Sequence, residues 1–151
     1  MDVPSSGERG TATSARSSGG AKSVRALRIL LVEDDVLVRC GTADMLSYAG
    51  HHVVEAGSAP EALEIFARGE IIDLLITDNR MPGMSGAALI ARVREGWPTL
   101  PILLVTGYAS REEGIGPDVG LLTKPFREAR LLTAVSEIVE RSPAQERRRS
   151  V

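Results

Sequence analysis

Five short runs of aliphatic residues, separated by stretches of helical periodicity, constrain the fold of this chain most strongly. The runs are Ile29–Val32, Val53–Val54, Leu74–Ile76, Ile102–Val105 and Leu121–Leu122. None of them alternates apolar with polar residues, and a continuous apolar run of this length suits a strand that is buried on both faces of a sheet. The pattern therefore predicts a parallel β-sheet that is covered on both sides.

Four segments between and after these runs show the periodicity of amphipathic helices, with apolar residues every three or four positions. The stripes are Val36, Cys40, Ala43, Leu46 and Ala49; Ala59, Ala62, Leu63 and Phe66; Gly86, Leu89, Ile90, Val93 and Trp97; and Leu131, Leu132, Val135, Ile138 and Val139. Right-handed crossovers between parallel strands would place such helices on both faces of the sheet, so we expect a doubly wound α/β fold. Cys40 lies on the first stripe, which predicts an inert thiol in the core.

Changes in amino-acid composition divide the chain into three parts. Residues 1–26 are small and polar and predict a disordered N-terminal arm. Ser142-Pro143 ends the last helical pattern, and residues 142–151 close the chain as a basic C-terminal tail. The remaining stretch, 27–141, holds about 115 residues, which is enough for one compact domain.

Charge and apolar content exclude several classes of protein. No apolar run approaches the roughly 18 residues of a membrane span, and the N-terminus lacks the apolar core of a secretory signal. The single cysteine cannot form an internal disulfide, which favours the reducing cytoplasm. Residues 27–141 carry seventeen acidic and eleven basic side chains, a net charge of −6, which argues against a DNA-binding surface.

Polar residues follow most of the predicted strands at the point where each strand ends. The run Glu33-Asp34-Asp35 follows the first strand, Asp78 the third and Thr106 the fourth, and Lys124 comes two residues after the fifth. Ligands of open α/β sheets bind in the crevice outside the carboxyl ends of the strands. These side chains are therefore expected to meet in one crevice.

The chemistry of this set suits a metal-assisted phosphoryl site. Carboxylates that converge in one place repel one another unless a cation lies between them, and Mg²⁺ favours such oxygen ligands. A lysine and a hydroxyl on the other side could hold an anion. One aspartate of the set could act as a nucleophile and form an aspartyl phosphate, but the residues alone do not choose which one.

Four ordered segments carry a resemblance to a known family. Val32–Asp35, Ile76–Gly86, Val105–Gly107 and Thr123–Phe126 closely resemble the signature segments of response-regulator receiver domains of two-component signalling. The resemblance covers roughly residues 28–141. It implies a five-stranded parallel sheet in the order 2-1-3-4-5, the flavodoxin-like arrangement.

The resemblance also implies a role for each residue at the phosphoryl side of the site. Asp78 would accept a phosphoryl group from a sensor histidine kinase or a histidine phosphotransfer protein. Thr106 would hydrogen-bond this group and Lys124 would pair with it. Pro125 would follow a cis peptide bond.

On the metal side, the resemblance implies a Mg²⁺ ion as cofactor. Asp34 would bind it directly and Glu33 through water, and Asp78 and the backbone carbonyl of Arg80 would be further ligands. Asp35 is instead predicted to be a helix N-cap. The pair His51-His52 is predicted to lie in a turn without metal, because no further ligands stand at suitable spacing.

Two departures from the family pattern concern signalling. Receivers often carry an aromatic residue three positions before the lysine, and this chain has Leu121 there. Only twelve residues separate Thr106 from Val119, and two glycines and a proline interrupt them, which predicts a shortened fourth helix. Tyr108 is a candidate to replace the missing aromatic residue.

The function that we predict is that of a stand-alone response regulator in a phosphorelay, because few residues follow Arg141. It would signal by phosphorylation-dependent contact with a downstream protein that the sequence does not identify. It would promote only its own phosphorylation and dephosphorylation, and it would bind neither DNA nor membranes. The alternatives are a pseudo-receiver scaffold and an aspartyl-phosphate phosphatase, although such phosphatases place a second aspartate where this chain has Arg80.

Overall fold

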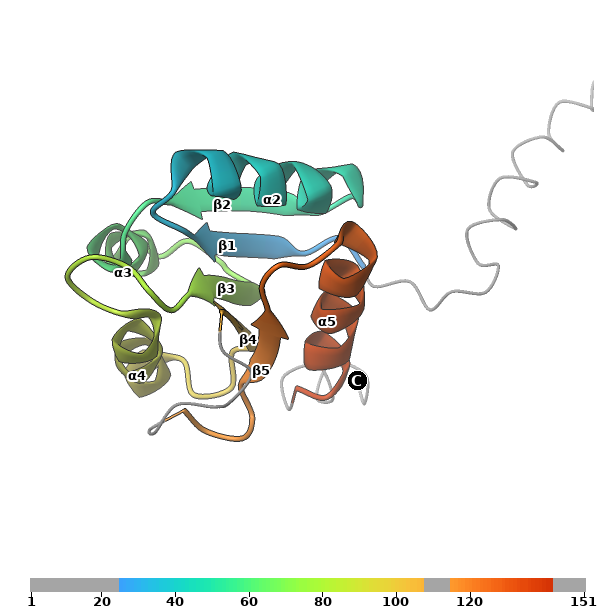
Figure 1. The fold of residues 1–151 in the computed structure, drawn as a ribbon. Coiled ribbons are helices and arrows are strands. Elements are labelled where there is room, and N and C mark those ends of the chain that lie inside the picture. Colours follow the sequence, from blue (N-terminus) through green and yellow to red (C-terminus); the bar gives the residue numbers. More distant parts are fainter. Residues whose placement is uncertain (1–24, 108–114, 143–151) are drawn as a thin grey trace, which may run out of the picture.

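The computed structural model describes residues 25–107 and 115–142, which contain five strands and four helices (Figure 1). The elements are β1 (Arg28–Val32), α2 (Val36–Tyr48), β2 (His52–Ala56), α3 (Ala59–Ala67), β3 (Leu74–Asp78), α4 (Gly86–Gly96), β4 (Ile102–Thr106), β5 (Gly120–Thr123) and α5 (Glu128–Glu140). Each aliphatic run of the sequence lies within a strand, and each helical stripe lies in or beside a helix.

The strands form one sheet in the order β2-β1-β3-β4-β5, and every pair is parallel. This confirms the predicted doubly wound α/β fold and its strand order. Every residue of β3 and of β4 is buried. The edge strand β2 is less covered than its apolar run suggests, because Val53 and Val54 are only half-buried.

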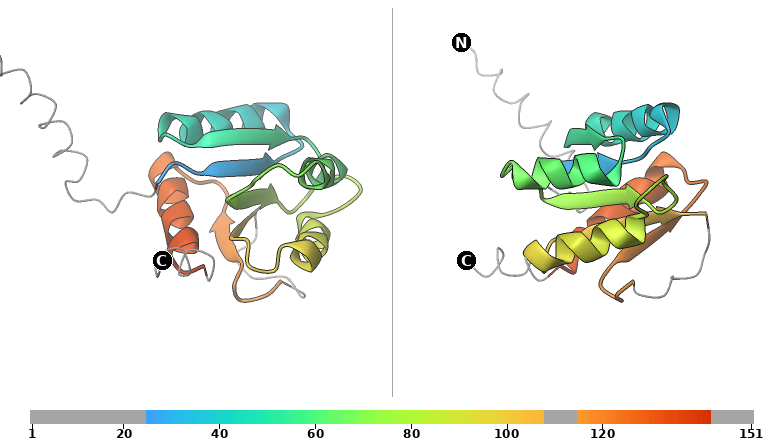
Figure 2. Two further views of the ribbon diagram at one scale, coloured as in Figure 1. Left: turned by 180° about the vertical axis from the view of Figure 1, so that it is seen from behind. Right: turned by 90° about the vertical axis from the view of Figure 1, so that its left-hand side faces the viewer.

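The two faces of the sheet form two separate cores. Along β1, Leu30 and Val32 belong to the cluster under α3 and α4, whereas Ile29 and Leu31 belong to the cluster under α2 and α5. Two views of the ribbon show these helix pairs on opposite sides of the sheet (Figure 2). Burying such a side chain contributes about 1.5–3 kcal/mol, so a continuous apolar strand stabilises both layers at once.

The first helical stripe was predicted correctly only in part, because Ala43 and Leu46 are buried as expected but Val36 and Cys40 are not. Cys40 is exposed and Val36 is 57% exposed, whereas the face of α2 toward the sheet carries Thr42, Ala43 and Leu46. The buried face of α2 thus shares Ala43 and Leu46 with the predicted stripe but includes Thr42 in place of Val36 and Cys40. The prediction that Cys40 is a core thiol was wrong.

The starts of three helices are fixed by N-cap side chains in the local sequence. The Asp35 carboxylate accepts hydrogen bonds from the backbone N–H groups of Leu37 and Val38 at 3.0 and 3.1 Å, which confirms it as the N-cap of α2. Ser58 and Ser85 cap α3 and α4 in the same way. These caps fix where each helix leaves the carboxyl edge of the sheet.

Some of the predicted features lie outside the described residues. Tyr108 and most of the segment in which the shortened helix was expected fall within residues 108–114, and the described residues 115–119 after it form a turn. The flanking segments 1–24 and 143–151 also lie outside, so the predicted arm and tail stay predictions. None of the helices within residues 25–107 and 115–142 is long and apolar enough to cross a membrane.

His51 has a structural contact that makes stability depend on pH. Its Nδ1 accepts a hydrogen bond from the backbone N–H of Leu27 at 3.1 Å, and burial lowers the pKa of the imidazole. His51 therefore takes up a proton less readily in the folded protein than in the unfolded chain. We expect the free energy of unfolding to fall as the pH drops from 7 to 5.

The test is His51→Asn, whose side-chain oxygen can accept the same hydrogen bond without titrating. Urea unfolding at several pH values should show a weaker loss of stability toward pH 5 in this variant. His52→Asn is the matched control, because His52 is exposed and its replacement should leave the pH profile unchanged. A profile that is unaltered in the first variant would contradict this assignment.

Candidate functional site

Three carboxylates meet at the carboxyl edge of the sheet. Glu33 and Asp34 follow β1 and Asp78 ends β3, and one oxygen from each lies within 4.8 Å of the others. Glu33 and Asp78 are 5% and 8% exposed, while Asp34 is exposed. The parallel pairing of β1 with β3 brings these residues together from positions more than forty residues apart.

The ammonium group of Lys124 faces two of these carboxylates. It follows β5, and its Nζ lies 3.3 Å from Asp78 Oδ1 and 3.4 Å from Glu33 Oε1. Burial acts to lower the pKa of Lys124, but the charges of Asp78 and Glu33 outweigh it and the pKa is raised. Lys124 is therefore held as a cation next to Asp78. The following Lys124–Pro125 peptide bond is cis, as predicted.

Thr106 completes the set of predicted side chains at this edge. It ends β4, is 5% exposed, and pairs in register with Thr123 of β5. Its backbone carbonyl accepts a hydrogen bond from the backbone N–H of Lys124 at 2.9 Å. This bond fixes the chain on which Lys124 stands relative to the end of β4.

The environment of Glu33 is mixed. Burial raises the pKa of its carboxyl group above the ordinary value, and the charge of Asp78 adds to the rise. The hydrogen bond from the backbone N–H of Asp35, at 3.1 Å, and the ammonium of Lys124 act in the opposite direction without cancelling it. A cation among the carboxylates would favour the ionised form of Glu33.

Two residues whose roles were not predicted, Asn79 directly after β3 and Gly86 at the start of α4, shape the connection between these elements. Asn79 is 5% exposed, and its Oδ1 accepts a hydrogen bond from the backbone N–H of Ala87 at 3.0 Å, which ties the start of α4 to the end of β3. Gly86 packs so tightly that a Cβ there would lie against the carbonyl oxygen of Asp78. The only sequence signals for these roles were an asparagine next to Asp78 and a glycine after the cap Ser85.

The remaining predicted positions also have defined places. Arg80, whose backbone carbonyl was expected to bind Mg²⁺, follows Asp78 by two residues and is exposed. Leu121 is partly buried in β5 and packs against the apolar cluster under α3 and α4. The strand position expected for an aromatic residue thus carries an aliphatic one that packs against the core.

The donor set fits a hard divalent cation. Three carboxylate oxygens converge within 4.8 Å, and two of the three carboxylates are largely removed from water. Mg²⁺ takes oxygen ligands and is commonly held by one or two carboxylates together with waters. The exposed Asp34 leaves one side of the cluster open for such waters.

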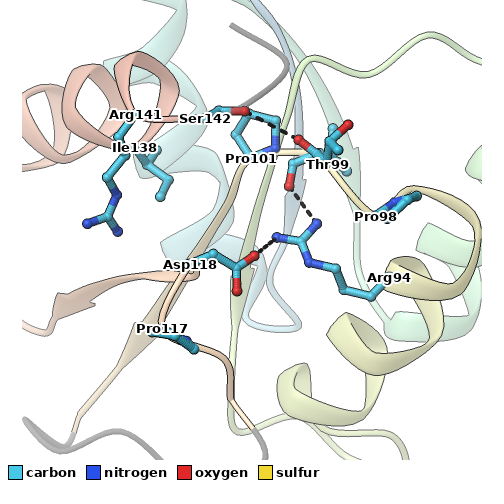
Figure 3. Close-up of a pocket in the computed structure, with 10 residues that line it drawn as sticks. Arg94, Pro98, Thr99, Pro101, Pro117, Asp118, Ile138, Arg141 and Ser142 are labelled. Atoms are coloured by element: carbon cyan, nitrogen blue, oxygen red, sulfur yellow. Dashed lines mark hydrogen bonds and ion pairs between the residues drawn. The ribbon is translucent and has the colours of Figure 1, made fainter. Parts of the chain in front are cut away.

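A cavity of about 200 Å³ lies away from this cluster, near the start of β4 and the end of α5 (Figure 3). Arg94 of α4 crosses it, donating to Asp118 Oδ2 at 2.6 Å and to the carbonyl oxygen of Leu100 at 2.7 Å. These bonds join α4 to the segments that precede β4 and β5. The contacts of Arg94 are thus structural.

Comparisons with known proteins agree with this geometry. The family model for the response regulator receiver domain matches residues 29–136. The response regulator protein FleR of Pseudomonas aeruginosa is 38% identical over 115 residues, which are 74% of this chain and 24% of FleR. The sensor kinase CckA of Brucella abortus is 37% identical over 118 residues, which are 75% of this chain and 12% of CckA.

Solved structures give the same result. A response regulator receiver protein from Sinorhizobium medicae superposes with a TM-score of 0.72 at 33% identity, covering 79% of this chain and 98% of that one. The receiver domain of the hybrid histidine kinase CckA superposes with a TM-score of 0.64 at 36% identity, covering 74% and 98%.

The sheet order and the acidic cluster define a flavodoxin-like α/β domain with a candidate site at the carboxyl edge of the sheet. The chain belongs to the response regulator receiver domain family of two-component systems. It spans only 24% and 12% of the lengths of FleR and CckA, respectively.

Proposed function

We propose that this protein accepts a phosphoryl group on Asp78 from a sensor histidine kinase or a histidine phosphotransfer protein. The observation that carries the proposal is the setting of the Asp78 carboxylate, which is 8% exposed, lies beside Glu33 and Asp34, and has the Lys124 ammonium at 3.3 Å. A nucleophilic carboxylate between a cation site and a fixed lysine is suited to phosphoryl transfer.

In the reaction, a carboxylate oxygen of Asp78 attacks the phosphorus of the donor. The P–O bond of the acyl phosphate forms as the P–N bond of a phosphohistidine breaks, and the donor imidazole leaves with the electron pair and takes up a proton. Lys124 pairs with the negative charge of the transferring group, and the Thr106 hydroxyl donates a hydrogen bond to it. Fixed charges of this kind supply most of the catalysis in phosphoryl transfer.

Glu33, Asp34, Asp78 and the backbone carbonyl of Arg80 are the groups that would hold Mg²⁺. When bound, the ion neutralises charge on the transferring phosphoryl group. Asp34 would bind it directly and Glu33 through a water molecule. The shielding of Glu33 and Asp78 from bulk water would strengthen these interactions.

The same site argues against turnover of external phosphate esters. A phosphatase that works through an aspartyl phosphate needs a general acid for the leaving group, and the position two residues after Asp78 carries Arg80. We therefore propose a signalling role, in which residues 27–141 act as the receiver domain and phosphorylation changes contacts with a downstream protein. A phosphorelay is the setting that this activity fits.

Beryllofluoride, which mimics an acyl phosphate, tests this proposal against a pseudo-receiver. With Mg²⁺ present, the protein should bind beryllofluoride, and amide resonances around Asp78, Thr106 and Lys124 should shift. Protein that binds Mg²⁺ but gives no beryllofluoride complex would be a scaffold without the phosphorylation reaction. That result would overturn the proposal.

Lys124→Gln should separate the two sides of the site. Removing the ammonium leaves Glu33 and Asp78 without their cation, so Mg²⁺ should bind about fivefold more tightly. Phosphorylation by acetyl phosphate should be slower, by about tenfold, because the charge opposite the phosphoryl group is gone. Calorimetry with MgCl₂ measures the Mg²⁺ affinity, and a time course measures the phosphorylation rate. If the affinity and the rate both rose or both fell, the assignment of Lys124 to the phosphoryl side of the site would be contradicted.

A further inference from the structure

A second charged cluster adjoins the acidic site, and its centre is the guanidinium group of Arg39 on α2. The Arg39 side chain is 18% exposed. Its Nη1 donates to the backbone carbonyl oxygen of Glu33 at 2.7 Å, and its Nε donates to Glu55 Oε1 on β2 at 3.1 Å. One side chain thus joins α2, the edge strand β2 and the turn that follows β1.

Arg39 holds this turn through its side chain. Its guanidinium donates to the carbonyl oxygen of Glu33, whereas its backbone N–H makes the ordinary first hydrogen bond of α2, to the carbonyl oxygen of Asp35 at 2.9 Å. The backbone N–H of Glu33 donates to the carbonyl oxygen of Ala56 at 3.1 Å, so both polar groups of the Glu33 backbone are bonded. The turn between these contacts carries the side chains of Glu33 and Asp34.

Gly57, just after β2, leaves the space that the guanidinium occupies. A Cβ at this position would lie 3.1 Å from Arg39 Nη1, which is a tight contact. The backbone N–H of Gly57 donates to Glu61 Oε1 at 2.8 Å, which anchors it to the first turn of α3. The place of Arg39 is therefore set from three sides, by Glu33, Glu55 and Gly57.

We propose that Arg39 is a positioning residue of the cation site, which fixes the turn of Glu33 and Asp34 so that their carboxylates converge with Asp78. This rests on the proposed function, in which that cluster binds Mg²⁺. The guanidinium touches the backbone of Glu33 and makes its ion pair with Glu55. Its effect on the cation therefore runs through the shape of the turn.

The direction in which the Mg²⁺ affinity changes when Arg39 is replaced separates a positioning role from a purely electrostatic one. Arg39→Gln removes a positive charge near a cation site, and charge alone predicts tighter Mg²⁺ binding. Loss of the positioning contact predicts the opposite, and groups that orient metal ligands typically change metal affinity by about 10–100-fold. We expect calorimetry of the full chain with MgCl₂ to show about tenfold weaker binding. Unchanged or tighter binding would overturn the proposal.

Two further variants keep the test independent of charge and of folding. Glu55→Gln removes the ion pair but keeps a side-chain oxygen that can accept a hydrogen bond from Arg39. The Mg²⁺ affinity of this variant should therefore stay within about twofold of the parent. A loss of about tenfold in this variant would assign the effect to the ion pair and contradict the proposal. Gly57→Ala keeps every charge but crowds the guanidinium, and it should weaken Mg²⁺ binding by about threefold. Equal affinity in Gly57→Ala and the parent would count against positioning.

Measurements on the parent protein distinguish a failure of the proposed function from a failure of the proposed role of Arg39. A parent chain that binds no Mg²⁺ and gives no beryllofluoride complex would remove the proposed function itself. If the parent instead binds both Mg²⁺ and beryllofluoride while Arg39→Gln has the same Mg²⁺ affinity and thermal stability as the parent, only the role of Arg39 would be overturned.

Discussion

Asp78→Asn is expected to fold like the parent and to lose acyl-phosphate formation. An amide is not a nucleophile toward phosphorus under these conditions, so incubation with Mg²⁺ and acetyl phosphate should give at least about 100-fold less phosphorylated protein. The change is nearly isosteric, and it removes one charge from a crowded acidic cluster, so the thermal midpoint should not fall. Intact-mass spectrometry measures the phosphorylated fraction directly.

Asp35→Asn is the matched control for this experiment. Asp35 stands at the same edge of the sheet, but its side chain caps α2, and asparagine caps a helix about as well as aspartate does. This variant should be phosphorylated to the parental level. Phosphorylation that persists in Asp78→Asn and disappears in Asp35→Asn would show that the acceptor has been misassigned.

Gly86→Ala is expected to destabilise the fold and distort the site. The added Cβ would lie against the carbonyl oxygen of Asp78 and 2.9 Å from the Cα of Asn79, and both neighbours are backbone atoms that cannot move aside cheaply. Overpacking of this kind costs about 1–3 kcal/mol, and we expect a value near the upper end. Urea unfolding should show this loss, together with weaker Mg²⁺ binding.

Gly96, at the other end of α4, provides the comparison. Nothing lies within 4 Å of a Cβ built there, so Gly96→Ala should be neutral or stabilising by roughly 0.5 kcal/mol through the backbone entropy of the unfolded chain. Equal effects of the two substitutions would mean that the close approach of α4 to β3 does not matter for stability or for the site.

The sheet could be predicted from the sequence because its central strands are buried on both faces. Strands β1, β3 and β4 each contain a run of consecutive buried apolar residues, Ile29–Val32, Leu74–Ile76 and Ile102–Val105, which is easily recognised in the sequence. The site residues could be predicted for a related reason. Parallel strands end at one edge, so the polar residues that follow Val32, Ile76 and Val105 had to meet there.

The buried face of α2 could be predicted only in part. Apolar periodicity identified Ala43 and Leu46, but it also selected Val36 and Cys40, which are exposed, and it did not indicate the buried Thr42. Contacts made through the backbone were also invisible. Neither the hydrogen bond from Arg39 to the carbonyl of Glu33 nor the approach of Gly86 to Asp78 leaves a pattern of residue types.

The measurement that tests the central claim most directly is the chemical mapping of the phosphorylated residue in the parent protein. After incubation with Mg²⁺ and acetyl phosphate, the sample is treated with borohydride, which reduces an acyl phosphate to an alcohol, and then digested for tandem mass spectrometry. A second sample is treated with hydroxylamine, which should remove the phosphoryl group. We predict a single reduced carboxylate, at Asp78. Phosphorylation of Asp34, Asp35 or a hydroxyl group would contradict the account. So would the absence of any phosphorylation when protein that binds Mg²⁺ is offered a phosphorylated histidine kinase as donor.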